Sequence, residues 1–198
     1  MTHAPNLLAP SPTVPYVLAI APGRREAALA VARPDHLVRW RTVNLRKVRS
    51  REARESRFRN AVETVLDDFV IARLVIVRVP KQEDVDGLLG AEDTWLAEEA
   101  QRRSVPAVSL DAENIRARSV SPGKHGPTNR LLAEAMLDRF PELRRADPAR
   151  THPGAEHLGG APESVVRTRR ERYYVRLILA VAATQIVLED LTTETVKP

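Results

Sequence analysis

Apolar and small residues alternate in three short segments near the start of the chain, at 15–21, 26–32 and 36–44. Alternation of this kind is typical of β-strands, because successive side chains of a strand point to opposite faces of a sheet. A Pro-Gly pair separates the first two segments and a Pro-Asp pair the next two, and both pairs favour tight turns. The sequence therefore predicts three consecutive antiparallel strands.

Spacings of three and four residues replace this alternation from about Arg54 to Val70, which predicts an amphipathic helix. Its buried face is expected to comprise Phe58, Ala61, Val62, Val65, Leu66 and Phe69. The segment 74–77 is an uninterrupted apolar and largely β-branched run, as expected for a central strand covered on both faces.

Helices and strands continue to alternate toward the end of the chain. The remaining sequence predicts helices at 91–103, 128–139 and 164–191, and a short strand at 105–110. Three antiparallel strands followed by helix, strand, helix, strand and helix is the succession of the ribonuclease-H-like fold, in which right-handed crossovers place the last two strands parallel to the first. We therefore predict an α/β fold with a five-stranded mixed sheet, three strands antiparallel and two parallel, flanked by helices.

The composition fits one domain. The chain has 198 residues, of which 43% are hydrophobic, and this is enough to bury a core. We expect the domain to span 15–191, after a disordered lead-in at 1–14 and before a tail at 192–198. Four prolines and three glycines with little apolar sequence around them predict a flexible connection at 141–163.

The sequence contains no cysteine, which excludes disulfides, thiolate metal sites and cysteine nucleophiles. A chain of this kind suits the reducing cytoplasm, where we expect it. Its apolar run at 177–188 is shorter than a bilayer span, and its first residues lack the basic and apolar regions of a secretory signal. We therefore expect no membrane partner.

Charge is unevenly distributed along the chain, whose net charge is +5. The segment from Arg46 to Arg59 contains seven basic residues against two glutamates, whereas Glu83 to Glu99 contains seven acidic residues and no basic one. Such segregation predicts a basic face that binds nucleic acid. The alternative is that arginine serves only as a solvated surface residue.

One stretch carries a resemblance to a known family. The sequence Leu-Ala-Ile-Ala-Pro-Gly at 18–23, followed by Ala-Ala-Leu-Ala-Val at 27–31, resembles the opening strand, Asp-Pro-Gly turn and second strand of the RuvC-type Holliday-junction resolvases, in the ribonuclease-H-like superfamily. The resemblance covers about residues 15 to 188. It is supported by Arg57, Ile115, Arg116, the loop 121–126 and the Ala/Leu-rich segment 177–182.

The resemblance implies a site built from four carboxylates around divalent metal ions. In the family one is the Asp before Pro-Gly, one is a Glu that ends the fourth strand, and two are Asp residues one turn apart on the last helix. In this sequence those places fall at or near Ala21, Arg78, Arg172 and Val175. None of the four is acidic, so we expect a divergent member without catalytic residues and without a metal cofactor.

Basic residues that the family uses to contact DNA are retained. The resemblance gives this role to Arg116, Lys124 and Arg130. The loop that holds Lys124 precedes a predicted helix, whose N-terminal backbone N–H groups accept phosphate readily. We expect Arg167, Arg169, Arg170 and Arg172 to add positive charge at the mouth of the same cleft, although they could instead solvate the start of a helix. If Arg78 also faces this cleft, its centre is cationic.

The resulting hypothesis is a RuvC-like pseudo-nuclease that binds nucleic acid, with duplex or branched DNA in recombination or repair as its partner. A second hypothesis is an active Holliday-junction endonuclease that uses Mg²⁺ and has its ligands relocated, for example to Glu83, Asp84 and Asp86 or to Asp111 and Glu113. The alternative for these acids is a solvated loop.

A third hypothesis is a non-catalytic protein-interaction subunit. Family resolvases are homodimers that associate through helices beside the sheet, so this chain could pair with itself or with an active resolvase paralogue. The corresponding segment, Leu88 to Arg103, carries Leu88, Leu89, Trp95 and Leu96 among acidic residues. These side chains could equally pack on the sheet of their own chain.

Overall fold

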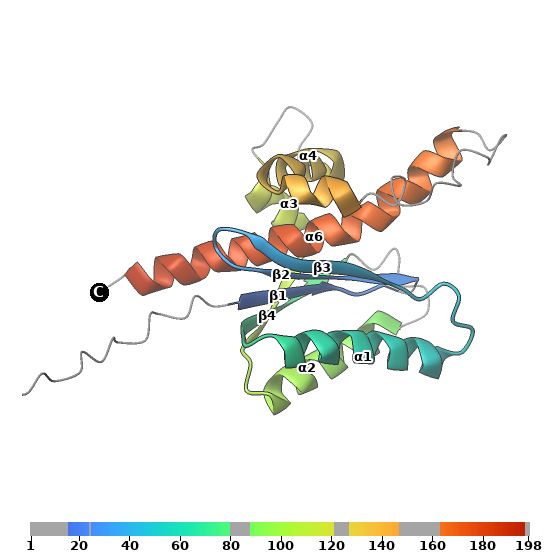
Figure 1. The fold of residues 1–198 in the computed structure, drawn as a ribbon, viewed down its shortest axis with the longest axis horizontal. Coiled ribbons are helices and arrows are strands. Elements are labelled where there is room, and N and C mark those ends of the chain that lie inside the picture. The colour runs from blue at the N-terminus through green and yellow to red at the C-terminus, as the bar shows by residue number, and fades with distance from the viewer. Residues whose placement is uncertain (1–15, 24, 80–87, 121–126, 147–162, 197–198) are drawn as a thin grey trace, which may run out of the picture.

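Three antiparallel strands form one half of the sheet, as their alternation predicts. In a computed structural model, which describes residues 16–23, 25–79, 88–120, 127–146 and 163–196, they pair in the order β3-β2-β1 (Figure 1). Side chains are described in these ranges except at 88–92, 144–146, 163–174 and 195–196. The strands are β1 (Tyr16–Ala21), β2 (Glu26–Ala32) and β3 (Leu37–Asn44).

Two parallel strands complete the sheet. β4 (Ile71–Arg78) pairs with β1, and β5 (Ala107–Asp111) pairs with β4, so the full order is β3-β2-β1-β4-β5. The register sets Ile20 opposite Ile76 across β1 and β4. This confirms the predicted five-stranded mixed sheet, and it brings the carboxyl ends of β1, β4 and β5 to one edge.

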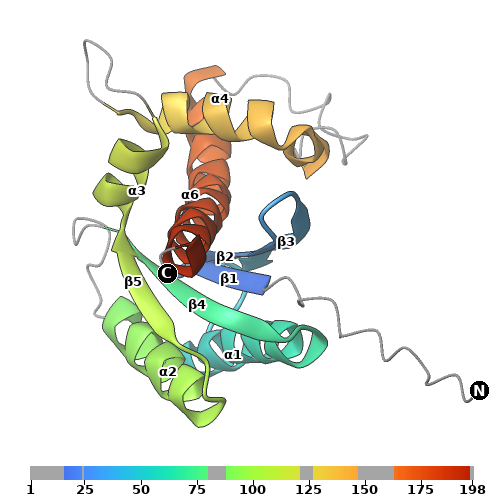
Figure 2. The same cartoon turned by 90° about the vertical axis from the view of Figure 1, so that its left-hand side faces the viewer.

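The helices occupy both faces of the sheet (Figure 2). One layer holds α1 (Arg51–Asp68) and α2 (Leu88–Arg102), and the other holds α3 (Ala112–Ser119), α4 (Asn129–Arg139) and α6 (Glu163–Val196). Four of these helices overlap the predicted ranges, whereas α3 was not predicted. None of the described helices is both long and apolar enough to cross a membrane.

Alternate residues of β1 face two separate cores. Ala19 and Ala21 belong to the core beneath α6, whereas Leu18 and Ile20 belong to the core above α1 and α2. The face beneath α6 is rich in alanine, with Ala19, Ala21, Ala28, Ala30 and Ala32 all fully buried. Small side chains on this face let the helix approach the sheet closely.

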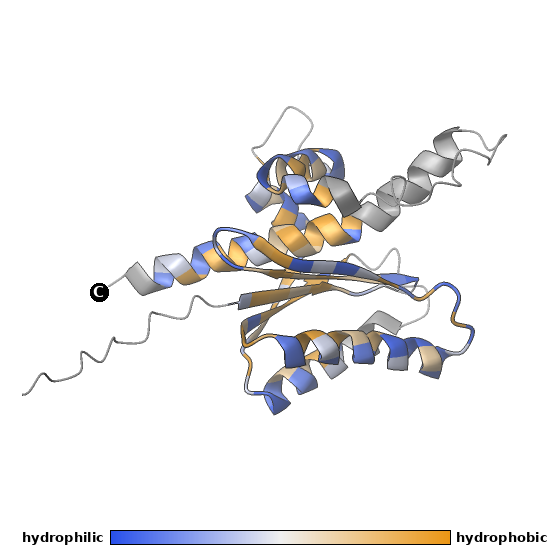
Figure 3. Ribbon diagram, viewed as in Figure 1, coloured by the Kyte–Doolittle hydropathy of each residue, from blue (hydrophilic) through white to orange (hydrophobic). Residues whose placement is uncertain are grey.

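The middle of α6 is apolar, and Figure 3 shows the side of it that faces the viewer. Residues from Leu177 to Ala183 are each no more than 3% exposed. A helix of this kind must be covered all round, and here the sheet lies on one side and α3 and α4 on the other. α6 is therefore held firmly against the sheet.

The segment predicted as a flexible connection begins with ordered structure. Pro141–Ala146 form a 3₁₀ helix, and Leu143 is fully buried in the core beneath α6. Composition did not reveal this short helix or its single apolar anchor, and the flexibility of the connection stays a prediction. Residues 147–162 and the predicted lead-in 1–14 lie outside the described residues.

The described apolar side chains of α2 pack within the chain. Leu96 is fully buried, and the rings of Trp95 and Phe58 meet edge to face with centroids 6.0 Å apart. These contacts favour the interpretation in which this helix packs on its own sheet. The side chains of Leu88 and Leu89 lie outside the described ones.

Candidate nucleic-acid interface

The site expected from the sequence lies where β1 ends. Ala21 is the last residue of the strand and has no exposed surface. Its side chain is a methyl group in the core beneath α6, and it offers no ligand to a metal ion. Pro22 and Gly23 then turn the chain toward β2.

An arginine from α6 covers this turn. The Arg176 guanidinium donates a hydrogen bond from Nη1 to the carbonyl oxygen of Pro22 at 2.5 Å. A Cβ atom added to Gly23 would lie 2.6 Å from Arg176 Nε and 2.7 Å from the carbonyl oxygen of Glu26. Glycine is favoured here because the Glu26 carbonyl oxygen, a backbone atom that cannot swing aside as the guanidinium can, occupies part of the space that a side chain would fill. A positive charge therefore lies at the carboxyl end of β1.

One buried carboxylate lies beside the turn, at the first residue of β2. Glu26 is 5% exposed, and its Oε2 accepts a hydrogen bond from Arg46 Nη2 at 3.0 Å. Because burial of an unpaired charge is costly, the ion pair with Arg46 explains why the carboxylate of Glu26 can be buried here. Glu26 is therefore already neutralised by a cation.

These residues do not fit a divalent metal ion. Hard cations such as Mg²⁺ need several oxygen ligands, and a catalytic site needs more than one carboxylate. Across the part of the chain that the structure describes, no group of three or more His, Cys, Asp or Glu side chains could hold a metal. Like charges about 4 Å apart cost about 4 kcal/mol at a typical protein dielectric, and a divalent ion near Arg176 would meet twice that.

The architecture matches solved structures. The structure of Thermus thermophilus RuvC has a TM-score of 0.63 and 16% sequence identity to this chain, with 92% of this chain and 99% of that one covered. The fold is RuvC-like. A second structure, T. thermophilus RuvC in complex with a Holliday junction substrate, has a TM-score of 0.60 and 14% identity, with 92% and 96% covered.

At this identity the likeness establishes the RuvC-like, ribonuclease-H-like fold and no more. No protein-family model matches the chain, and a search of curated proteins finds no match. The functional interpretation therefore depends on which residues this RuvC-like fold brings to the end of β1.

Arg78 ends β4 but does not face α6. Val77 belongs to the core beneath α6, whereas Ile76 belongs to the opposite core, so strand alternation directs Arg78 toward α1 and α2. Its Nε lies 3.6 Å from Oδ2 of Asp93 on α2. The condition under which Arg78 would make the cleft cationic is therefore not met, and Arg176 supplies the charge instead.

The candidate positions on the last helix are only partly described. Val175 is half-buried and packs against the core beneath α6. The structure describes the helical backbone of the arginine cluster, but the side chains lie outside the described ones at Arg167, Arg169, Arg170 and Arg172. Lys124 and the acids Glu83, Asp84 and Asp86 also lie outside the described residues. Their roles stay predictions.

Two other predicted DNA contacts meet where α3 approaches α4. Arg116 is half-buried on α3 and donates from Nη1 to Oδ1 of Asn129, the first residue of α4, at 3.1 Å. Arg130 follows Asn129, is exposed, and donates from Nε to Glu134 at 2.9 Å. The fold therefore brings Arg116 and Arg130 to the same end of α4.

Asp111 and Glu113, the second pair considered for relocated ligands, are exposed at the junction of β5 and α3. Asp111 occupies the N-cap position of α3 without a side-chain capping hydrogen bond. Among the described residues, they do not belong to any group of three or more His, Cys, Asp or Glu side chains that could hold a metal ion.

The sequence reasoning missed Arg176. This charged residue stands immediately before the apolar run that begins at Leu177, and Val175 precedes it. A charge so close to a buried segment must find a polar partner. That requirement was a usable signal, although the identity of the partner, a backbone carbonyl at Pro22, could not be read from the sequence.

Proposed function

We propose that this chain is a RuvC-like protein that binds duplex or branched DNA, in recombination or repair, and does not cleave it by metal-dependent chemistry. The observation that carries the proposal is the guanidinium of Arg176 on the Pro22–Gly23 turn. It lies beside Ala21, at the place where the resemblance expects a metal-binding carboxylate.

Replacement of metal-binding carboxylates by a guanidinium changes which group the site binds. Carboxylates repel phosphate unless metal ions lie between them, whereas a guanidinium attracts phosphate directly. Binding without cutting therefore needs no metal at the end of β1. In this proposal, Ala21, Val175 and Arg172 stand at positions whose catalytic function has been lost, and Arg176 contributes positive potential.

The start of α4 supplies a further phosphate-binding region. Arg116 and Arg130 flank Asn129, and the backbone N–H groups of the first helical turn add partial positive charge. Lys124 precedes this helix in sequence and is proposed to contact the same phosphates. T. thermophilus RuvC in complex with a Holliday junction substrate supports a junction as the first DNA to try.

The proposal is tested by measuring DNA affinity with and without chelator. Fluorescence anisotropy with a labelled four-way junction and a labelled linear duplex should show binding that falls steeply with salt. Addition of EDTA should leave the affinity unchanged, because no step of binding uses a metal ion. A lack of binding at low salt, or binding that requires Mg²⁺, would contradict the proposal. Light scattering on the same samples reports whether the chain acts alone, as a homodimer or with a resolvase paralogue.

A further inference from the structure

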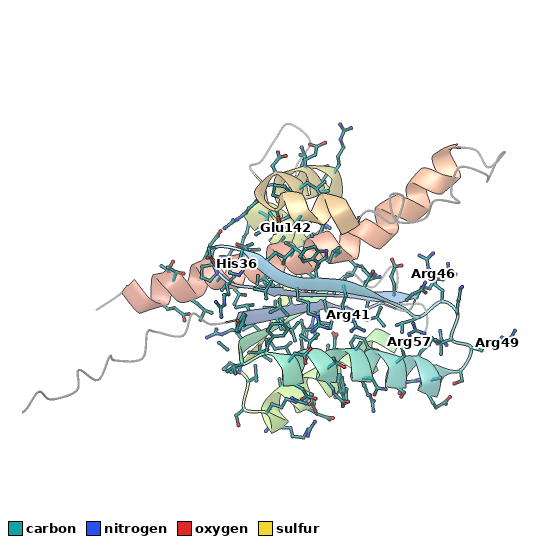
Figure 4. All side chains as sticks on the ribbon, in the orientation of Figure 1. His36, Arg41, Arg46, Arg49, Arg57 and Glu142 are labelled. Carbon is teal, nitrogen blue, oxygen red and sulfur yellow. The ribbon has the colours of Figure 1, made fainter. Side chains whose placement is uncertain are left out.

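Positive side chains gather where β3 runs into α1. They are contributed by the β1–β2 turn, by β3, by the loop after β3 and by α1, and they comprise Arg25, Arg41, Lys47, Arg49 and Arg57. We name these five residues the β3–α1 basic surface. Figure 4 shows Arg49 and Arg57 toward the end of the molecule where the loop after β3 meets α1, and Arg41 nearer the middle of the view, between the sheet and α1.

The backbone holds the elements of this surface together. The amide of Leu45 donates to the carbonyl oxygen of Arg25 at 2.9 Å, so the loop after β3 lies against the β1–β2 turn. Arg41 pairs with Leu29 in the register of β2 and β3. At the start of α1, the side chain of Ser50 accepts from the amide of Ala53 at 3.1 Å and fixes the helix end. The cations are thus presented by ordered backbone.

Three neighbouring arginines have a carboxylate partner, whereas these five have none among the residues that the structure describes. Arg46 pairs with Glu26, and both Arg51 and Arg59 pair with Glu55. Within the described ranges, by contrast, no member of the β3–α1 basic surface forms an ion pair. All of them are exposed except the half-buried Arg41. Several adjacent uncompensated cations repel one another, and a polyanion relieves that repulsion.

We propose that the β3–α1 basic surface binds the DNA phosphate backbone, as a second contact region beyond the β1 turn. Four of its five residues are arginines, whose planar fork matches two phosphate oxygens. Arg25 lies two residues after Gly23, so the surface begins near the turn that Arg176 covers. The inference rests on the proposed function for the identity of the polyanion, and it adds where a DNA arm runs.

The test compares salt dependence of DNA binding in charge-neutral variants. Arg49→Gln/Arg57→Gln removes two exposed cations and leaves both side chains polar. Each phosphate contact adds about a 3.5-fold loss of affinity between about 50 and about 200 mM salt, so loss of two contacts should reduce the total salt effect about twelvefold. Arg118→Gln/Arg139→Gln is the matched control, because it also removes two exposed arginines, and these are already paired with Asp190 at 2.5 Å and with Glu189 at 3.1 Å.

The outcomes separate this inference from the proposed function. If the double variant binds DNA with the same salt dependence as the wild type, the β3–α1 basic surface does not contact DNA, and the proposed function still stands. An equal loss in Arg118→Gln/Arg139→Gln also overturns it, since removal of two positive charges from any part of the surface would then explain the effect. Tighter binding of an acidic polypeptide than of DNA, with the same variant sensitivity, assigns the surface to a protein partner. If the wild type cuts DNA in a metal-dependent reaction and the double variant still shows the reduced salt dependence, only the proposed function is overturned.

Discussion

Arg176 on α6 donates a hydrogen bond to the carbonyl oxygen of Pro22, which lies 154 residues earlier in the sequence. This contact fastens the final helix to the first turn of the sheet. It also leaves Gly23 no room for a side chain. The same guanidinium thus stabilises the fold and sets the charge at the end of β1.

Gly23→Ala should destabilise the protein. The new methyl group would overlap the guanidinium of Arg176 and the carbonyl oxygen of Glu26, and overpacking of this kind costs about 1–3 kcal/mol. Urea unfolding of the single variant measures that cost.

The double variant Gly23→Ala/Arg176→Ala shows how much of the stability lost in Gly23→Ala comes from the clash with Arg176. Removal of the guanidinium should recover part of the loss, and the clash with the Glu26 carbonyl should keep the rest. Strict additivity of the two single substitutions would show that Arg176 does not occupy this space in solution.

Arg130→Gln and Lys124→Ala should each weaken DNA binding. Each is proposed to contact one phosphate, so the slope of log affinity against log salt should fall by about 0.9 per substitution. Glu134→Gln should act in the opposite direction, because it frees Arg130 from its ion pair. Anisotropy titrations over a salt series check all three, and slopes equal to wild type would remove these residues from the interface.

Gln185→Met should stabilise the protein. Gln185 is 3% exposed on α6, and neither its amide nitrogen nor its amide oxygen has a hydrogen-bond partner among the residues that the structure describes. A buried polar group without partners costs about 1–3 kcal/mol, which an apolar side chain of similar length should recover. Thermal unfolding measures the gain.

Thr184→Val is the matched control, because the buried hydroxyl of Thr184 already donates to the carbonyl oxygen of Val181 at 2.7 Å. It should bring no comparable gain. Equal effects of the two substitutions would mean that Gln185 is satisfied in solution.

Stability should decline in acid through Glu99. Burial of Glu99 favours its neutral form, but hydrogen bonds from Arg102 and Arg103 outweigh burial and hold the pKa of the carboxyl below its usual value near 4.5. Arg103 also pairs with Asp67 at 2.6 Å, so the network joins α2 to α1. Because the pKa is lower in the folded state, the stabilisation is complete above about pH 4.5 and is lost as pH falls through the folded pKa.

Urea unfolding at several pH values checks this expectation. Wild type should lose free energy of unfolding below about pH 4.5, and Glu99→Gln should lose less over the same interval. Identical profiles for the two proteins would exclude Glu99 as a source of the acid sensitivity.

Local periodicity was sufficient to predict the five strands and most helices. Spacings of three and four over 54–70 reflect the buried face of α1, whereas all seven residues of β2 are buried, so both faces of that strand are covered. The helix at Ala112–Ser119 was missed because eight residues give little more than two turns of periodicity.

The side of the sheet to which Arg78 points could not be predicted, for a different reason. Residues 74–77 are all apolar because both faces of β4 are covered, so the sequence contains no alternation from which to assign sides. The absence of a carboxylate at Ala21 was visible in the sequence. The presence of Arg176 beside it depends on long-range packing of α6 against β1.

A single assay tests the proposed absence of metal-dependent cleavage. A labelled four-way junction is incubated with the wild-type chain in millimolar Mg²⁺ or Mn²⁺, under salt conditions where binding is complete, and the products are resolved on a denaturing gel. We expect the junction to be bound by the protein and to remain intact with either ion. Cleavage that requires the ion and disappears in the variant Glu83→Gln/Asp84→Asn/Asp86→Asn would contradict it and would establish an active nuclease with relocated ligands.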